Sequence, residues 1–180
     1  FKLRGALNKL LSLNDDEKEK GVIAVSTGNH GKGVAYAAKV LGIKSTIYMS
    51  SMVPNYRKEA IESLGAKVEI VGKNSDEADL FAKKLSKEKN ITLIHPFDDE
   101  DIIIGQGTTG LEMLNEFPDV DTVIIPTSGG GLVSGIALAI KLQKPKTKVI
   151  AVSMERGPSM YESLKKGAPV DVEEIETLAD

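Results

Sequence analysis

The chain has 180 residues, with 23 Lys and Arg against 26 Asp and Glu and only 4% aromatic residues. Balanced charge and few aromatic side chains argue against a nucleic-acid partner. The absence of cysteine excludes disulfides, thiolate metal sites and a cysteine nucleophile, and it fits a cytoplasmic protein. No apolar run approaches the roughly 20 residues of a membrane span, so we expect no membrane association. The chain opens at Phe1 rather than at a methionine, and we expect residues before it.

The first half of the chain alternates predicted helices and strands. Leucines at helical spacing predict an amphipathic helix over 3–13, and a charged, solvated segment follows at 14–20. Short apolar, β-branched runs predict strands at 22–25, 45–49, 67–71 and 91–94. Helices are predicted between these strands at 31–41, 54–64 and about 75–89. Pro54 suits a first helical position, and Asn74 or Ser75 suits an N-cap.

The second half continues this alternation after a loop at 95–99. A helix is predicted over 101–117 in spite of three glycines, which suggest an irregular start or close packing. Strands are predicted at 122–126 and 148–153, with helices at 132–142 and in a last short segment that ends near 167. The acidic tail, 171–180, shows no clear period. Alternating strands and helices predict an α/β fold with a mostly parallel sheet.

Two short segments that follow predicted strands carry the candidate chemistry. Residues 128–132 (SGGGL) lead into the helix at 132–142, and their glycines let backbone N–H groups turn toward a ligand. The helix N-terminus adds partial positive charge, so this layout is typical of a phosphate site. A tight turn without a ligand remains the alternative. Residues 26–31 (STGNHG) follow the strand at 22–25 in the same way.

The common nucleotide signatures are absent from both segments. A P-loop requires Ser or Thr after its lysine, and Gly33 follows Lys32. A dinucleotide fingerprint requires a third glycine, but Ser134 or Tyr36 stands at the required position. We therefore expect neither ATP nor NAD as a ligand.

Together with residues 1–6 (FKLRGA), these two segments resemble the fold-type II pyridoxal-phosphate enzymes. Within these enzymes, the chain is similar to the threonine/serine dehydratase and serine racemase group. The resemblance continues through 94–99 (IHPFDD) and 105–108 (GQGT) and covers nearly the whole chain. It implies a two-lobed fold of the tryptophan synthase β type, with open, mostly parallel twisted sheets flanked by helices. This chain would be a part of such a protein.

The same resemblance implies how the chain divides between the two lobes. Residues 1–20 and 99–180 would belong to the larger, cofactor-binding lobe, and residues 21–98 would form the smaller lobe. A homodimer is also implied, by resemblance alone.

The resemblance assigns roles to individual residues. Lys2 would form the Schiff base with pyridoxal 5'-phosphate and then remove the substrate's α-proton. Asn29 would hydrogen-bond the cofactor's phenolic oxygen. The substrate carboxylate would lie against the N-terminus of the helix at 31–41, near Ser26, Thr27 and His30. The cofactor phosphate would be held by Ser128, Gly129, Gly130, Gly131 and Leu132.

Several of these residues have simpler interpretations when the resemblance is set aside. Lys2 is then an exposed terminal lysine, and Asn29 is a loop residue that forms an Asx turn. Ser26 or Thr27 can act as a helix N-cap only. His95, before a proline, is better interpreted as a hydrogen-bonded structural histidine than as a catalytic one.

The implied reaction is dehydration of a hydroxy amino acid, such as threonine or serine, to a 2-oxo acid and ammonia. Racemisation or another elimination on the same cofactor is an alternative, because Thr27 retains a hydroxyl where racemases of this group carry a serine. A third alternative is a non-catalytic chain that binds a small phosphorylated ligand or regulates a partner. It arises because no match to the family's C-terminal partner of the pyridine nitrogen occurs before Asp180.

Two further details concern the branch of the family to which the chain would belong and the possibility of a metal site. Residues 152–157 (VSMERG) and 177–180 (TLAD) resemble dehydratases found in hydroxyectoine-utilisation pathways. Some relatives bind a divalent cation near a glutamate, and Ser153 stands at that position here. Because a hydroxyl is a weaker ligand for a hard cation than a carboxylate, we expect no metal site.

Overall fold

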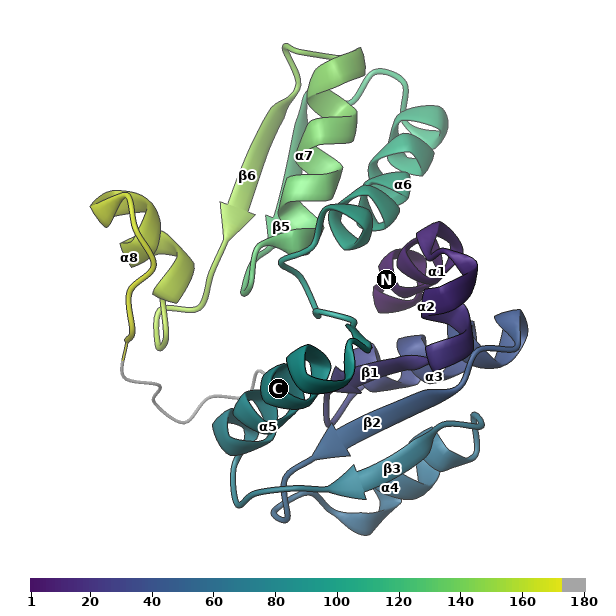
Figure 1. Cartoon of the computed structure of the whole chain (residues 1–180). Coiled ribbons are helices and arrows are strands. Elements are labelled where there is room, and N and C mark those ends of the chain that lie inside the picture. Colours follow the sequence, from purple (N-terminus) through teal and green to yellow (C-terminus); the bar gives the residue numbers. More distant parts are fainter. Residues whose placement is uncertain (173–180) are drawn as a thin grey trace. The chain divides into compact units, whose positions relative to one another are not determined.

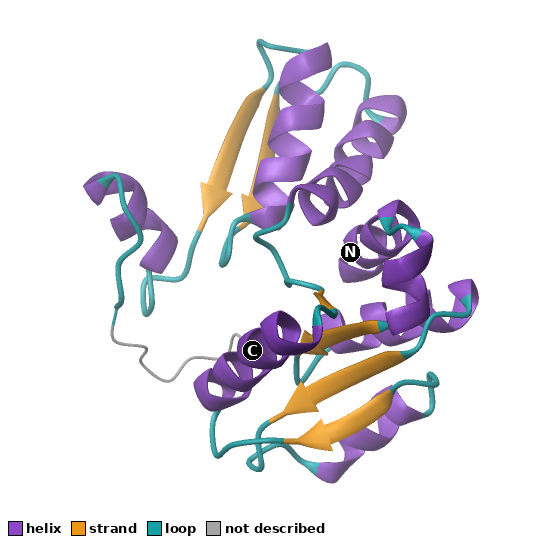
Figure 2. Ribbon diagram, viewed as in Figure 1, coloured by secondary structure: helices purple, strands orange, loops and turns teal. Residues whose placement is uncertain are grey.

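Helices and strands alternate along residues 1–172, the part of the chain that the computed structural model describes (Figures 1 and 2). In chain order they are α1 Lys2–Ser12, α2 Asp15–Lys20, β1 Val22–Val25, α3 Asn29–Leu41, β2 Ser45–Met49, α4 Asn55–Glu62, β3 Lys67–Ile70, α5 Ser75–Lys89, β4 Thr92–Leu93, α6 Glu100–Glu116, β5 Thr122–Pro126, α7 Gly131–Gln143, β6 Lys148–Val152 and α8 Ser159–Lys166. The predicted α/β class is confirmed.

The chain divides into two compact units, Phe1–Gln106 and Gly107–Asp180. The division falls within α6. The lobes predicted from the resemblance, 1–20 with 99–180 and 21–98, do not coincide with these units. The assignment of residues to lobes therefore stays a prediction.

The first unit is organised around a parallel sheet with the strand order β3-β2-β1-β4. The register places Val22 beside Ser45 on one neighbouring strand and beside Thr92 on the other. Because all strands run in the same direction, their carboxyl ends share one edge of the sheet, where ligands bind in open α/β folds. The segment that follows β1 begins at this edge.

Successive side chains along the strands point to opposite faces of the sheet and pack in two separate hydrophobic clusters. Ala24, Ile47 and Met49 pack in a cluster with residues of α1, α3 and α4, whereas Ile23 and Tyr48 pack in a cluster with Ala82 of α5. Helices α3 and α4 therefore cover one face of the sheet and α5 covers the other (Figure 1). Burial on both faces explains why the central strands β1 and β2 carry largely apolar runs.

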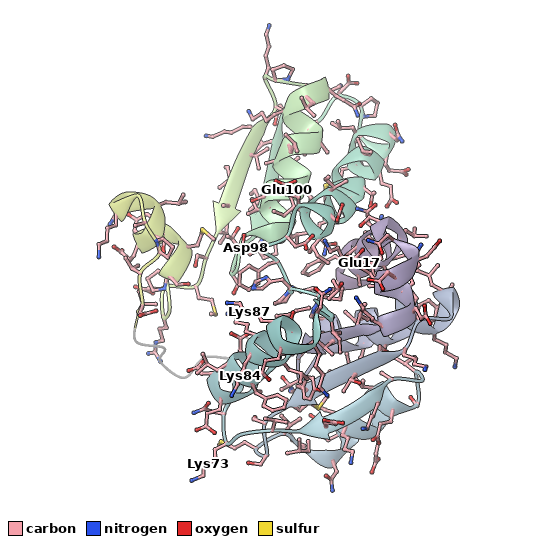
Figure 3. All side chains as sticks on the ribbon, in the orientation of Figure 1. Glu17, Lys73, Lys84, Lys87, Asp98 and Glu100 are labelled. Carbon is pink, nitrogen blue, oxygen red and sulfur yellow. The ribbon has the colours of Figure 1, made fainter. Side chains whose placement is uncertain are left out.

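Charged side chains lie on the solvent side of these helices. In α5, Ala78 and Ala82 are buried, while Lys84 and Lys87 are exposed (Figure 3). Asn74 accepts a hydrogen bond from the N–H of Glu77 at 2.9 Å, so of the two predicted N-cap candidates, Asn74 and Ser75, it is Asn74 that caps α5. Helix α5 therefore follows the amphipathic pattern of a surface helix.

The second unit contains the parallel pair β5 and β6, with Val123 beside Val149. Val123 and Ile125 are buried in a cluster with Ile136 and Ile140 of α7. Between them Ile124 is 65% exposed, so within this unit one face of the pair is covered and the other is open to solvent. Helix α7 follows β5 after the short loop 127–130 and packs on the covered face.

The structure corrects several details of the predicted elements. The charged segment 14–20 contains helix α2, which begins with a capping box between Asn14 and Glu17. Pro54 is the N-cap of α4 rather than its first helical residue. Helix α6 is continuous, so its glycines serve close packing and not an irregular start. Residues 173–180, which include most of the acidic tail and the 177–180 segment, lie outside the described residues.

Candidate active site

Lys2 lies in the first turn of α1, and its amine is partly buried. The Nζ atom donates a hydrogen bond to the carbonyl oxygen of Pro96 at 2.6 Å. Burial lowers the pKa of Lys2 below its ordinary value, because the charged form loses more hydration than the Pro96 carbonyl restores. A larger fraction of neutral amine is therefore present near neutral pH than for an exposed lysine. A neutral amine is both a nucleophile and a base.

Glycines set the position of the helix that carries Lys2. A Cβ atom on Gly33 of α3 would lie 3.1 Å from the N atom of Leu3 and 3.2 Å from the C atom of Lys2. A Cβ atom on Gly105 of α6 would lie only 2.6 Å from the Cα of Gly5. Only glycine permits such close approach of two backbones. The backbones of α3 and α6 therefore pack directly against the first turns of α1.

A buried side chain completes this packing around α1. Gln106 is 1% exposed, and its Oε1 accepts a hydrogen bond from the N–H of Gly5 at 3.3 Å. The first N–H groups of a helix have no partner within the helix, so a buried acceptor at this point satisfies a backbone donor. No role was predicted for Gln106 from the sequence. The sequence did contain a signal for such a role, because Gln106 lies in segment 105–108, which contributes to the family resemblance.

The segment between β1 and α3 contains the predicted substrate-binding residues. Ser26 and Thr27 are partly buried, and Asn29 is exposed. The N–H of Gly28 donates to Oγ of Ser26 at 3.2 Å. Gly28 is the N-cap of α3 and no side chain caps this helix, so Ser26 is not a helix N-cap here. The backbone donors of the first turn of α3 are thus available to an anion.

The side chain of His30 is buried, unlike those of its neighbours in this segment. It is 4% exposed, and its Nε2 lies 2.9 Å from the carbonyl oxygen of Ile94. Burial lowers the pKa of His30 to about 4, so the ring is neutral at pH 7. The predicted contact of His30 with substrate therefore rests on its backbone N–H, because its side chain faces the interior.

The second glycine segment joins β5 to α7 in the other unit. Gly130 is the N-cap of α7 with φ of +87°, in the left-handed region that favours glycine, and no side chain caps the helix. A Cβ atom on Gly130 would lie 2.8 Å from the Cε of Met160. Ser128 is exposed and Gly131 is buried. Open N–H donors at a helix N-terminus behind a glycine turn form a phosphate-binding arrangement.

The predicted site residues therefore fall into two groups. Lys2, Asn29 and the three predicted substrate-binding residues, Ser26, Thr27 and His30, belong to the first unit, and residues 128–132 belong to the second. Within the first unit, Lys2 and His30 contact carbonyl groups of the same short segment, 94–96. Pro96 was not predicted as a site residue, because it acts through its backbone oxygen and has no reactive side chain.

His95 has the structural role expected from its position before a proline. Its Nδ1 accepts hydrogen bonds from the N–H groups of Asp98 at 2.8 Å and Phe97 at 3.3 Å. Its ring also packs edge-on against the ring of Phe97, with centroids 4.7 Å apart. These contacts close a turn after β4.

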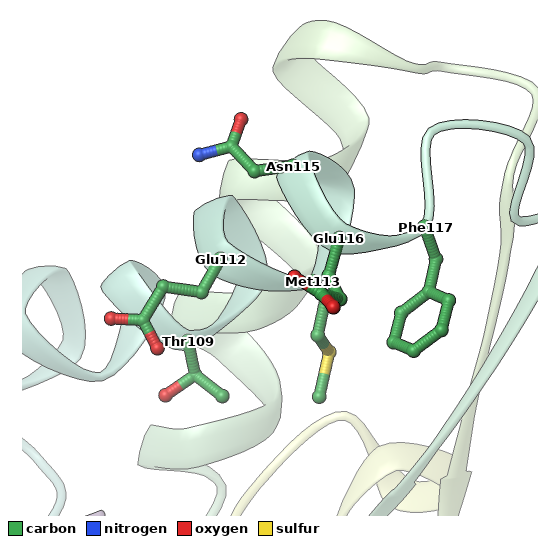
Figure 4. Close-up of a pocket in the computed structure, with 6 residues that line it drawn as sticks. All are labelled: Thr109, Glu112, Met113, Asn115, Glu116 and Phe117. Carbon is green, nitrogen blue, oxygen red and sulfur yellow. The ribbon is translucent and has the colours of Figure 1, made fainter.

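A surface pocket on α6 contains none of the predicted site residues (Figure 4). It is lined by Thr109, Glu112, Met113, Asn115, Glu116 and Phe117. All six residues come from the end of one helix and the residue that follows it. No group of three or more His, Asp or Glu side chains that could hold a metal occurs in residues 1–172, and the expected absence of a metal site stays a prediction. In the same residues, no helix is long and apolar enough to cross a membrane.

Comparison with known proteins decides the family. The family model described as pyridoxal-phosphate dependent enzyme matches residues 1–180. The chain belongs to the pyridoxal-phosphate-dependent enzyme family. The family prediction made from the sequence is thereby confirmed.

Individual relatives narrow the position of the chain within this family. A putative threonine dehydratase of Sinorhizobium fredii is 47% identical over 180 residues, which are 100% of this chain and 54% of that protein. The processed form of threonine deaminase isoform 2 from Solanum lycopersicum has a TM-score of 0.95 at 40% identity, and the match covers 99% of this chain and 52% of that one. Maize serine racemase has a TM-score of 0.89 at 34% identity, over 95% of this chain and 52% of its own. The chain spans about half the length of the relatives it matches.

The residues present fit pyridoxal phosphate in two respects. The glycine turn before α7 offers uncapped backbone donors to a phosphate, and a side chain at Gly130 would fill the turn. Lys2 offers an amine whose pKa is lowered by burial, as an imine-forming lysine requires.

Proposed function

We propose that the protein catalyses the pyridoxal-phosphate-dependent dehydration of a hydroxy amino acid, such as threonine or serine. The products are a 2-oxo acid and ammonia. The observation that carries the proposal is the partly buried amine of Lys2, with its lowered pKa, in a chain of this family. The relatives from Sinorhizobium fredii and Solanum lycopersicum, a threonine dehydratase and a threonine deaminase by name, support this reaction class.

Pyridoxal phosphate, when bound, supplies an aldehyde for amines and a ring that stabilises negative charge at the substrate's α-carbon. Lys2 would provide the amine that holds this group. Its Nζ then removes the α-proton, and burial favours this role because the amine is neutral in a larger fraction of molecules. Loss of the α-proton and the β-hydroxyl removes one water, and hydrolysis then releases ammonia.

The segment before α3 provides the groups that orient the substrate. Uncapped N–H groups at the N-terminus of α3 favour an anion, and the substrate carboxylate is the anion that the reaction brings. The hydroxyls of Ser26 and Thr27 add hydrogen-bonding groups at the same place. The exposed amide of Asn29 would hydrogen-bond the cofactor's phenolic oxygen, as the resemblance implies.

The segment 128–132 holds the cofactor phosphate in this proposal. The left-handed conformation of Gly130 turns the backbone so that successive N–H groups lie at the start of α7. Ser128 adds an exposed hydroxyl. These residues bind and orient, and take no part in proton transfer.

A borohydride-trapping experiment tests the proposal on the full-length protein. The protein is incubated with pyridoxal phosphate, its absorbance spectrum is recorded, and the sample is reduced and mapped by peptide mass spectrometry. We expect a reduced pyridoxyl group on Lys2, absent from Lys2→Ala and retained in Lys32→Ala, an exposed lysine of α3. A group that maps elsewhere, or an identical spectrum in Lys2→Ala, contradicts the assignment of Lys2.

Racemisation is the second candidate, and the structural likeness to maize serine racemase favours it. Thr27 retains a hydroxyl at the position where a second acid/base would act. Product analysis distinguishes the reactions: oxo acid and ammonia from L-serine or L-threonine support dehydration, whereas D-serine without oxo acid supports racemisation. Thr27→Ser should increase any racemase side activity, because it removes the methyl group next to the hydroxyl.

Three narrower predictions accompany the proposed function. Placement in the hydroxyectoine-utilisation branch rests on segments 152–157 and 177–180, and a deletion strain that still grows on hydroxyectoine would contradict it. The homodimer is checked by sedimentation of the full-length protein in an analytical ultracentrifuge. Cytoplasmic location is checked by cell fractionation.

A further inference from the structure

The ring of His30 is held by one hydrogen bond in the interior of the first unit. Its Nε2 lies 2.9 Å from the carbonyl oxygen of Ile94. Because a carbonyl oxygen only accepts, Nε2 carries the hydrogen and donates it. In the neutral ring Nδ1 is then unprotonated, and this buried atom has no hydrogen-bond partner among residues 1–172. Among residues 1–172, the carbonyl of Ile94 is therefore the one hydrogen-bond partner of this side chain.

Ile94 is the first fixed point of a short segment after β4. Its N–H donates to the carbonyl oxygen of Ile23 at 2.8 Å, and its own carbonyl accepts from His30. At the next residue, Nδ1 of His95 accepts from the N–H groups of Phe97 and Asp98 and closes a turn. Both ends of the segment are thus held by hydrogen bonds.

The carbonyl group of Pro96 lies between these two fixed points. It accepts the hydrogen bond from the Lys2 amine at 2.6 Å. The proline ring restricts φ, so the direction of this carbonyl depends on the peptide groups on either side. A change at Ile94 is therefore transmitted to the acceptor of Lys2 over only two residues.

We propose that the His30 side chain is a positioning residue for Lys2, acting through the carbonyl of Ile94 and the segment that ends at Pro96. It fixes the acceptor that holds the Lys2 amine in its partly buried place. The importance of this role for catalysis rests on the proposed function of Lys2. The hydrogen-bond connection itself does not, and it can be tested without cofactor.

Substitutions at His30 separate positioning from simple packing. A Gln side chain places its amide N–H about where Nε2 lies, whereas the shorter Asn side chain reaches only to the place of Nδ1. Because Nδ1 has no partner in the described residues, Gln replaces every hydrogen bond that the His30 side chain makes there. His30→Gln should therefore preserve the position of Lys2, and His30→Asn and His30→Leu should not.

Competitive acetylation of lysines measures the effect on the full-length protein freed of pyridoxal phosphate. Labelling by acetic anhydride is quantified for the Lys2 and Lys32 peptides between about pH 7 and 11. In the wild type, the Lys2 profile should have its midpoint below that of Lys32, an exposed lysine of α3. In His30→Leu and His30→Asn the released amine reaches water, so the Lys2 midpoint should rise. We expect the neutral fraction at about pH 8 to fall by about threefold or more.

A matched control removes a methyl group from the same core at the other end of α3. Ile43 is buried in the same cluster as Ile94 and takes no part in the hydrogen bond between His30 and Ile94, so Ile43→Val should cost about 0.5–1.5 kcal/mol and leave that bond in place. Its Lys2 profile should match the wild type. An unchanged Lys2 profile in His30→Leu, or an equal change in Ile43→Val, overturns the proposal. So does a Gln variant that behaves like Asn.

A measurement on the unmutated protein keeps the proposal testable if variants fail to fold. The ¹⁵N–¹H correlation spectrum of the imidazole groups distinguishes the two neutral tautomers of histidine. We expect His30 with its hydrogen on Nε2, and hydrogen on Nδ1 overturns the proposal. Failure of the trapping experiment at Lys2 would instead contradict the proposed function and leave the labelling result standing.

Discussion

The Nζ of Lys2 donates a hydrogen bond to the carbonyl oxygen of Pro96 across 2.6 Å, although the two residues are 94 positions apart in the chain. This contact joins the first turn of α1 to the turn that follows β4. It places a lysine amine where burial lowers its pKa. Buried groups and close-packed glycines around α1 maintain this arrangement, and their contributions can be measured one at a time.

His30 should make the stability of the protein depend on pH. In an unfolded chain histidine binds a proton near pH 6.5, whereas His30 in the folded protein binds one only near pH 4, because burial disfavours the charged ring. The unfolded state therefore holds more protons between these values. The free energy of unfolding should fall as the pH drops through this window, by up to about 3 kcal/mol from this residue.

Urea unfolding of wild type and His30→Gln at several pH values isolates this contribution, because Gln does not titrate. The stability of the wild type relative to the variant should decrease by that amount between about pH 7 and pH 4. The two groups that face His30 electrostatically, Lys2 and His95, are present in both proteins. A stability difference that stays constant with pH would show that His30 titrates normally.

Gly105 permits the backbone contact between α6 and α1. The Cβ atom of an alanine would lie 2.6 Å from the Cα of Gly5 and 2.7 Å from the carbonyl oxygen of Arg4, and these backbone atoms cannot move aside without shifting α1. Gly105→Ala should lower the free energy of unfolding by about 1–3 kcal/mol. Ile104→Ala, at an exposed position of the same helix, is the control and should change it little. Equal urea midpoints for wild type and Gly105→Ala would refute the close packing.

Gly130→Ala should weaken the glycine turn through the backbone rather than through a clash. With φ of +87°, an L-residue costs about 1–2 kcal/mol at this position. The side chain of Met160 is also close, with Cε 2.8 Å from the point that a Cβ atom would occupy, but its end is flexible. We expect weaker binding of pyridoxal phosphate in equilibrium titrations. The double variant Gly130→Ala/Met160→Ala should not recover it, and recovery would assign the defect to the clash.

Asp99 should stabilise the start of α6 in two ways. Its Oδ1 accepts from the N–H groups of Asp101 at 2.9 Å and Ile102 at 3.2 Å, and its Oδ2 lies 2.9 Å from the Nζ of Lys9. Asp99→Ala should lower the free energy of unfolding by about 1–2 kcal/mol, mainly through loss of the cap. Asp99→Asn keeps a capping oxygen and should recover most of this loss. A urea midpoint for Asn no better than that for Ala would assign the effect to the ion pair.

Local sequence patterns predicted most of the helices and strands, because each pattern depends on only a few neighbouring residues. Strand β2 and helix α5 begin and end as expected, since apolar runs, an N-cap at Asn74 and a left-handed C-cap at Asn90 act over a few residues. Helix α2 was missed because its six residues are all charged and no periodic apolar face marks it. Its capping box, Asn14 with Glu17, was the signal in the sequence.

The motifs in residues 1–6, 26–31 and 128–132 were enough to identify the family and the residue types that its chemistry needs. Such motifs are local: a few adjacent residues determine the backbone conformation and supply the reactive groups, as in the turn at Gly130. The tertiary structure alone decided that the His30 side chain faces Ile94, and that the acceptor of the Lys2 amine is a proline carbonyl. These contacts join residues 64 and 94 positions apart. They form only when parallel strands and packed helices bring together backbone atoms that carry no distinguishing side chain.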